Sequence, residues 1–123
     1  MQLLLVMIGG ALGSGARYLT NRAMLAGFGP DFPYGTLTVN LVGGLLMGLL
    51  VGALARTGGG EGWRLFVGVG LLGGFTTFSA FSLDLVTMIE RGSAMLAIGY
   101  ALASVIGAAI ALFAGLALAR SVA

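Results

Sequence analysis

The chain has 123 residues, of which 59% are hydrophobic and only 8% are charged, whereas a soluble domain carries roughly 25% charged residues. It contains no Cys and no His, which excludes thiolate and imidazole nucleophiles, the Ser-His-Asp relay and the usual zinc ligands. Its formal net charge of +2 comes from scattered arginines rather than a basic stripe, so we do not expect it to bind nucleic acid. The composition as a whole predicts a membrane protein that is not an enzyme.

Four apolar segments are candidates for membrane spans, each of which needs about 20 apolar residues. Charged residues, prolines and glycine-rich loops set their bounds at about 2–26, 34–55, 64–90 and 94–119. The connections between them are short. We therefore predict an all-α membrane protein in which residues 1–123 form a single domain of four transmembrane helices.

The arginines near the ends of the spans do not favour one orientation in the membrane. Cytoplasmic loops normally carry an excess of positive residues. Here the side of the N-terminus would receive Arg56, Arg64 and Arg120, and the other side would receive Arg17, Arg22 and Arg91. Either copies of the chain insert in both orientations and pair as antiparallel dimers, or the even division of six charges is a coincidence.

Small residues recur at four-residue spacing within the spans, as in Gly9 and Gly13 or Gly70 and Gly74. Such faces let helices approach closely in lipid, where no hydrophobic drive acts between them. They suit packing within one four-helix bundle, and they also suit a tight homodimer.

Polar side chains interrupt the second span, where such groups usually face a cavity or a partner. Thr36 and Asn40 are four residues apart and share one helix face. A Thr in a span commonly bonds its own backbone, whereas the Asn amide needs partners for its two donors and its carbonyl. Asn40 is therefore as good a candidate for a functional role as for a structural one.

The third span contains the sequence Gly73-Gly74-Phe75-Thr76-Thr77. Paired glycines followed by β-branched threonines weaken a helix locally, so we expect a break at 73–77 or a simple kink. Phe75 follows Arg64 by about 16 Å of helix, near the middle of a membrane core about 30 Å thick. At that depth, free carbonyls can hold a cation, while N–H groups and hydroxyls favour an anion.

Two further pairs of side chains share helix faces. Phe78 and Phe81 are three residues apart, and Tyr100 and Ser104 on the fourth span are four apart. Aromatic residues at this spacing usually belong to a core or face lipid. Their ring edges carry positive quadrupole charge, however, and could contact a small anion.

Three sequence blocks resemble the CrcB/Fluc family of fluoride channels, and the likeness covers the whole chain. They are GGALGSGARY at 9–18, GTLTVNLVG at 35–43 and GGFTTFSAF at 73–81. The resemblance implies a passive, fluoride-selective channel of the prokaryotic plasma membrane that exports this toxic ion from the cytoplasm. It also implies an antiparallel, dual-topology homodimer with two pores.

The resemblance further implies roles for individual residues. A structural sodium ion, which is not transported, would lie on the dimer axis and be held by the backbone carbonyls of Gly73 and Thr76. Arg17 would lie in the vestibule. Ala80 stands where the family usually has Thr, and Ala108 continues the face of Tyr100 and Ser104 without a hydroxyl. The fluoride pathway would comprise Asn40, Thr77, Phe78, Ser79, Phe81, Tyr100 and Ser104.

Two other functions stand as alternatives. A small dual-topology multidrug transporter has a similar length and number of spans, but it relies on a carboxylate in its first span, and residues 1–16 contain none. A non-transporting membrane assembly protein would leave the unusual Thr76-Thr77 segment unexplained.

Overall fold

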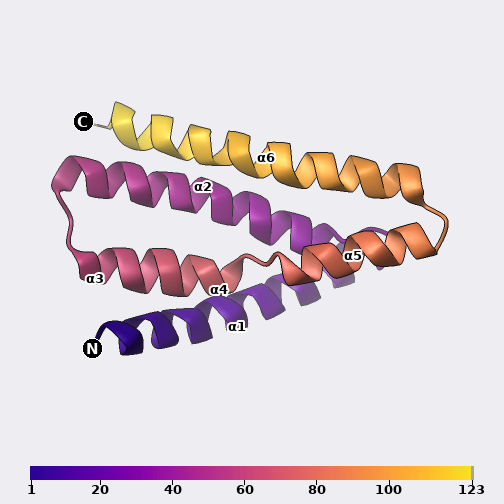
Figure 1. Cartoon of the computed structure of the whole chain (residues 1–123), viewed down its shortest axis with the longest axis horizontal. Helices are drawn as coiled ribbons and strands as arrows, with labels where there is room; N and C mark the ends of the chain where they lie inside the picture. The colour runs from indigo at the N-terminus through magenta and orange to yellow at the C-terminus, as the bar shows by residue number, and fades with distance from the viewer. Residues whose placement is uncertain (123) are drawn as a thin grey trace.

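The computed structural model describes residues 1–122, which form helices joined by short loops (Figure 1). Four stretches are long and apolar enough to cross a membrane, so the predicted all-α class with four long helices is confirmed. The third stretch, Glu61–Glu90, consists of several helical pieces. The elements are α1 (Gln2–Phe28), α2 (Tyr34–Thr57), α3 (Glu61–Trp63), η1 (Arg64–Leu72), α4 (Gly73–Phe75), α5 (Ser79–Glu90) and α6 (Ala94–Ser121).

Successive spans run in alternating directions, so the N-terminus and the C-terminal end of α6 lie at the same end of the bundle (Figure 1). Each connection contains a glycine with a positive φ: 82° at Gly29, 65° at Gly58 and 82° at Gly92. These left-handed conformations turn the chain at the ends of helices at little steric cost. The expected short loops therefore have a clear local cause.

Glycines hold the helices together in two closely packed pairs, α1 with η1 and α4, and α2 with α6. A Cβ atom at Gly70 would lie 2.8 Å from the carbonyl oxygen of Val6 on α1. A Cβ atom at Gly44 would lie 2.7 Å from the carbonyl oxygen of Ala108 on α6. These small-residue faces therefore serve packing within one chain, the first of the two uses expected from the sequence.

The surface of the helices is largely apolar. Leu3 and Phe113 are each 71% exposed, and many other large hydrophobic side chains point outward. A small core forms where α5 meets α6, from Phe81, Met88, Ala97 and Tyr100. Most hydrophobic side chains thus face outward, as a helix bundle in lipid requires.

The third span changes its winding twice. Within η1 the helix is a π-helix, and the N–H of Gly73 donates to the carbonyl of Gly68, five residues back. After α4, residues 76–78 are not helical, and Thr76 has an extended backbone with φ −83° and ψ 161°. We call residues 76–78 the interruption. It starts later than the break expected at 73–77, because Gly73 and Gly74 remain helical. Thr76 and Thr77 are the first residues outside the helix.

Candidate functional site

An open groove of about 360 Å³ lies between α2, α6 and the interruption. We call it the central groove. Residues from five segments line it, including η1 and α5. Among them are five of the residues singled out in the sequence: Asn40, Thr77, Phe78, Phe81 and Ser104. Tyr100 lies behind Phe81, with the two ring centroids 5.2 Å apart. Ser79 and Arg17 are not part of the lining.

Ser104 is the most unusual polar residue of the central groove. Its side chain is 5% exposed, and within residues 1–122 its hydroxyl has no hydrogen-bond partner. A buried hydroxyl without a partner costs about 1–3 kcal/mol, and such groups commonly have a functional explanation. Ser104 therefore carries a hydrogen-bond donor without a partner at the wall of the groove.

Asn40 is held against the interruption. Its Nδ2 donates to the carbonyl oxygen of Thr77 at 3.1 Å, and its Oδ1 accepts from the N–H of Thr77 at 2.9 Å. This pair of bonds occupies the side-chain oxygen and one of the two amide hydrogens. The second amide hydrogen is still available to a ligand.

The side chain of Thr77 starts the next helix. Its Oγ1 accepts from the N–H of Ala80 at 3.1 Å and lies 3.5 Å from the hydroxyl of Ser79. A threonine oxygen that accepts from a free N–H three residues on stabilises the start of a helix. The hydroxyl at this end of the groove is thus already engaged, and Ser79 itself is exposed.

The two phenylalanines of the groove differ in their exposure. Phe81 is 6% exposed, whereas Phe78 is 77% exposed although it lies in the middle of a span. Their ring centroids are 5.8 Å apart with an interplanar angle of 45°. The ring edges can therefore line a narrow path, of which Phe78 forms the open side.

Tyr100 connects the groove with Asp84, an acid that is not among the residues predicted for the site. The Tyr100 hydroxyl donates to the Asp84 carboxylate at 3.0 Å, and the Tyr100 ring is 1% exposed. Phe32 packs edge-on against that ring at 5.4 Å and 84°. A signal for Asp84 was present in the sequence, because it follows Phe81 by three residues and shares its helix face.

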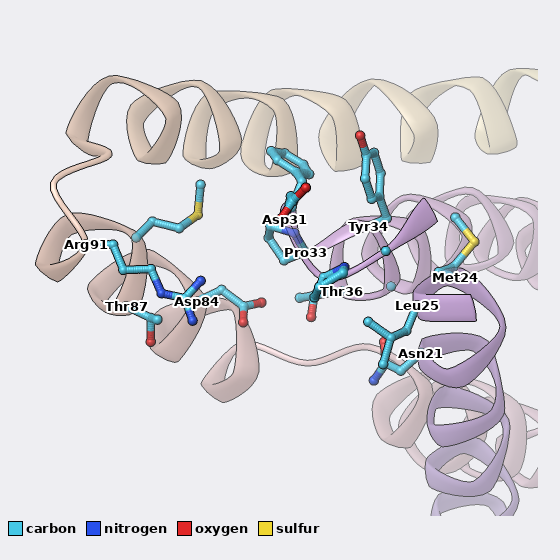
Figure 2. A pocket seen from close by; sticks show the side chains of 15 residues that line it. Asn21, Met24, Leu25, Asp31, Pro33, Tyr34, Thr36, Asp84, Thr87 and Arg91 are labelled. Carbon is cyan, nitrogen blue, oxygen red and sulfur yellow. The ribbon is translucent and has the colours of Figure 1, made fainter. Parts of the chain in front are cut away.

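Asp84 also lines a second hollow, which we call the end cavity (Figure 2). This cavity has a volume of about 310 Å³ and lies between α1, the loop before α2, the start of α2, and α5. Polar side chains surround it, including Asn21, Thr36, Thr87 and Arg91. The contacts from Asp84 through Tyr100 to Phe81 thus connect the polar end cavity with the central groove.

Besides these polar side chains, the backbone carbonyls near the interruption form a second set of polar groups. Arg17 donates from Nε to the carbonyl oxygen of Gly74 at 3.1 Å, and Thr77 is bonded to Asn40. Within residues 1–122, the carbonyls of Gly73 and Thr76 accept no side-chain hydrogen bond and none of the backbone hydrogen bonds outside the regular helices. No cluster of acidic side chains that could hold a metal occurs in residues 1–122. The free carbonyls therefore fit a cation that is bound by backbone oxygens.

Four apolar spans, an outward-facing hydrophobic surface and a polar groove within the bundle define a small multi-pass membrane protein. Comparison with known proteins gives its family. The sequence model of the family described as "CrcB-like protein, Camphor Resistance (CrcB)" matches residues 4–116. The chain therefore belongs to the CrcB family, which confirms the resemblance seen in the three sequence blocks.

Similar proteins come from several bacteria. The fluoride-specific ion channel FluC of Mesorhizobium japonicum is 60% identical over 119 residues, which cover 97% of this chain and 96% of the relative. That of Sphingopyxis alaskensis is 60% identical over 116 residues, covering 94% and 92%. That of Caulobacter vibrioides is 54% identical over 123 residues, covering 98% and 97%. These relatives are named as ion channels and not as enzymes.

Proposed function

We propose that this chain forms a passive, fluoride-selective channel that lets the toxic ion leave the cytoplasm across the prokaryotic plasma membrane. The observation that carries the proposal is the buried Ser104 hydroxyl, which has no hydrogen-bond partner within residues 1–122 and belongs to a residue that lines the central groove. A hydroxyl, an amide hydrogen of Asn40 and aromatic ring edges are weak donors that can replace part of the hydration of a small anion. The relatives named as fluoride-specific channels support the same conclusion.

Selectivity follows from the donors that the groove offers. Its lining contains neither arginine nor carboxylate, so a bound anion meets no fixed charge that would trap or repel it. Conduction requires binding that is strong enough for entry and weak enough for exit. In this proposal the ion passes from the groove along Phe81 and Tyr100 to the end cavity, where the Tyr100 hydroxyl, bonded to Asp84, lies.

The conducting unit in this proposal is an antiparallel, dual-topology homodimer. Three observations support it: the central groove is open, Phe78 is 77% exposed within a span, and the arginines divide evenly between the two sides. A second, inverted copy would cover Phe78 and close each groove into a pore. Two copies would give two pores.

A structural sodium ion at the centre of the dimer belongs to the same proposal. Gly73 and Thr76 would hold it through their carbonyls, and two inverted copies would supply two carbonyls each. Unwound backbone within a span commonly binds such ions. The interruption then serves as a break near the membrane midplane, where the two copies meet.

The channel is tested with purified protein in liposomes loaded with potassium fluoride. We expect valinomycin to trigger rapid fluoride efflux, measured with a fluoride electrode, and we expect no matching chloride efflux from liposomes loaded with potassium chloride. Liposomes without protein provide the control. Absence of fluoride efflux from folded protein would refute the channel and favour a non-transporting membrane protein.

The orientation is tested separately, because the chain contains no natural cysteine. Gly60 is exposed in the α2–α3 loop, and no neighbouring atom lies within 4 Å of the position that a Cβ atom would take there. In sealed cells that produce Gly60→Cys, dual topology predicts that about half of the thiols react with a membrane-impermeant maleimide and the rest react only after permeabilisation. Labelling entirely from one side would refute the antiparallel dimer.

A further inference from the structure

Two side chains from neighbouring helices bind the backbone around the interruption. Arg17 on α1 bonds the carbonyl of Gly74, and Asn40 on α2 bonds both the N–H and the carbonyl of Thr77. These bonds span 57 and 37 positions of sequence. The interruption is therefore held from two directions by residues that are far from it in the chain.

Such bonds are needed because a helix that ends inside a membrane leaves carbonyls and N–H groups without partners. The Gly74 carbonyl belongs to the last turn before the interruption, where the helix end carries partial negative charge. The half-buried guanidinium of Arg17 supplies a charged donor there. The planar amide of Asn40 resembles a peptide group, so it can satisfy both polar atoms of Thr77 at once.

The carbonyls are thereby divided into two groups. Those of Gly74 and Thr77 are taken by side chains, whereas those of Gly73 and Thr76 receive none of the hydrogen bonds found outside regular helix in residues 1–122. Along the chain, the free carbonyl of Gly73 directly precedes the engaged carbonyl of Gly74, and the free carbonyl of Thr76 directly precedes that of Thr77. Holding each engaged carbonyl restricts the neighbouring free one, because only two backbone dihedrals separate adjacent peptide planes.

We propose that Arg17 and Asn40 are positioning residues that fix the interruption and leave the carbonyls of Gly73 and Thr76 free for a cation. This inference rests on the proposed sodium site. It gives Arg17 a different role from that of a vestibule residue which attracts anions. Asn40 keeps its place in the lining of the groove, and its oxygen and one amide hydrogen serve the backbone.

The two roles of Arg17 predict different measurements. Fluoride flux is measured in liposomes as a function of sodium, with N-methyl-D-glucamine as the replacement cation, and separately as a function of fluoride. For Arg17→Gln we expect the sodium concentration at half-maximal flux to rise about tenfold or more, because a hydrogen bond to a charged group is lost. The fluoride concentration at half-maximal flux should stay within about twofold, the scatter of a distant change.

A matched control removes the same charge from another position on the same helix. Arg22 lies on the same helix, is exposed, and stacks on Tyr18 at 5.9 Å rather than on the interruption. Arg22→Gln therefore removes the same charge and should leave the sodium dependence unchanged. Arg17→Lys should raise the sodium concentration at half-maximal flux less than Arg17→Gln does. The inference is overturned if Arg17→Gln raises the fluoride requirement alone, or if Arg17→Gln and Arg22→Gln behave alike.

The role of Asn40 is tested through the atom that it contacts. Replacing the Thr77 amide by an ester, with the α-hydroxy analogue of threonine, removes the N–H that donates to Asn40. If Asn40 acts through this backbone, the ester should reduce thermal stability in wild type and cause little further loss in Asn40→Ala. Independent, additive losses would overturn the inference. This readout needs no flux, so it separates failure of the positioning role from failure of the channel.

Discussion

Removing the Ser104 hydroxyl should move stability and transport in opposite directions. The side chain is 5% exposed and its Oγ has no partner within residues 1–122. An unsatisfied buried polar group costs about 1–3 kcal/mol. The void left by a single oxygen atom is small, so it costs less than the void left by a large side chain. We therefore expect Ser104→Ala to raise the free energy of unfolding by about 1 kcal/mol.

Transport should respond in the other direction. If the hydroxyl replaces part of the hydration shell of fluoride, its loss removes one hydrogen bond to a charged species, which is worth about 1.5–3 kcal/mol. The flux should then fall by about tenfold or more. Ser14, an exposed serine on α1 outside the groove, gives the matched control Ser14→Ala.

Both quantities can be measured on one preparation, as thermal unfolding in detergent and as fluoride efflux from liposomes. Wild type, Ser104→Ala and Ser14→Ala are compared. A variant of Ser104 that is less stable than wild type and conducts at the same rate would refute the reasoning on both counts. It would mean that the hydroxyl has an internal partner and no contact with the ion.

Three other predictions concern packing and the path. Gly70→Ala should destabilise the protein by about 1–3 kcal/mol through a clash with the backbone of α1, whereas Gly15→Ala, which meets no atom within 4 Å, should be neutral or slightly stabilising in thermal unfolding. Phe81→Ile should reduce fluoride flux severely while dimers persist on size-exclusion chromatography, and unchanged flux would remove this ring from the path. Tyr100→Phe removes the hydroxyl that donates to Asp84. It should reduce fluoride flux about threefold or more, because one polar group of the proposed path is lost, and unchanged flux would exclude this hydroxyl from the path.

The four long helices could be predicted from the sequence because their signal is local. Charges and loop residues bound each apolar run, and the structure has helical segments at Gln2–Phe28, Tyr34–Thr57, Glu61–Glu90 and Ala94–Ser121. Length and polarity of a run are enough to predict a span. Several helix ends extend a little beyond the expected bounds, since the terminal turns of a helix tolerate polar residues, such as Arg56 in a last turn and Glu61 in a first turn.

The contacts of the site could be predicted only in part. Asn40 was a candidate because an amide in a span needs partners, but nothing in the sequence indicates that its partner is the backbone of Thr77, 37 positions away. Asp84 was not among the predicted site residues. Its bond to Tyr100 depends on the turn that brings α5 against α6.

The interruption has a mechanical consequence as well as a chemical one. Before it, η1 and α4 pack against α1, and after it, α5 packs against α6. One span thus packs its first half against α1 and its second half against α6, with three non-helical residues between the halves. A substitution that restored continuous helix at 76–78 would force both halves onto one helix axis. The contacts with α1 and the contacts with α6 could then not both be kept.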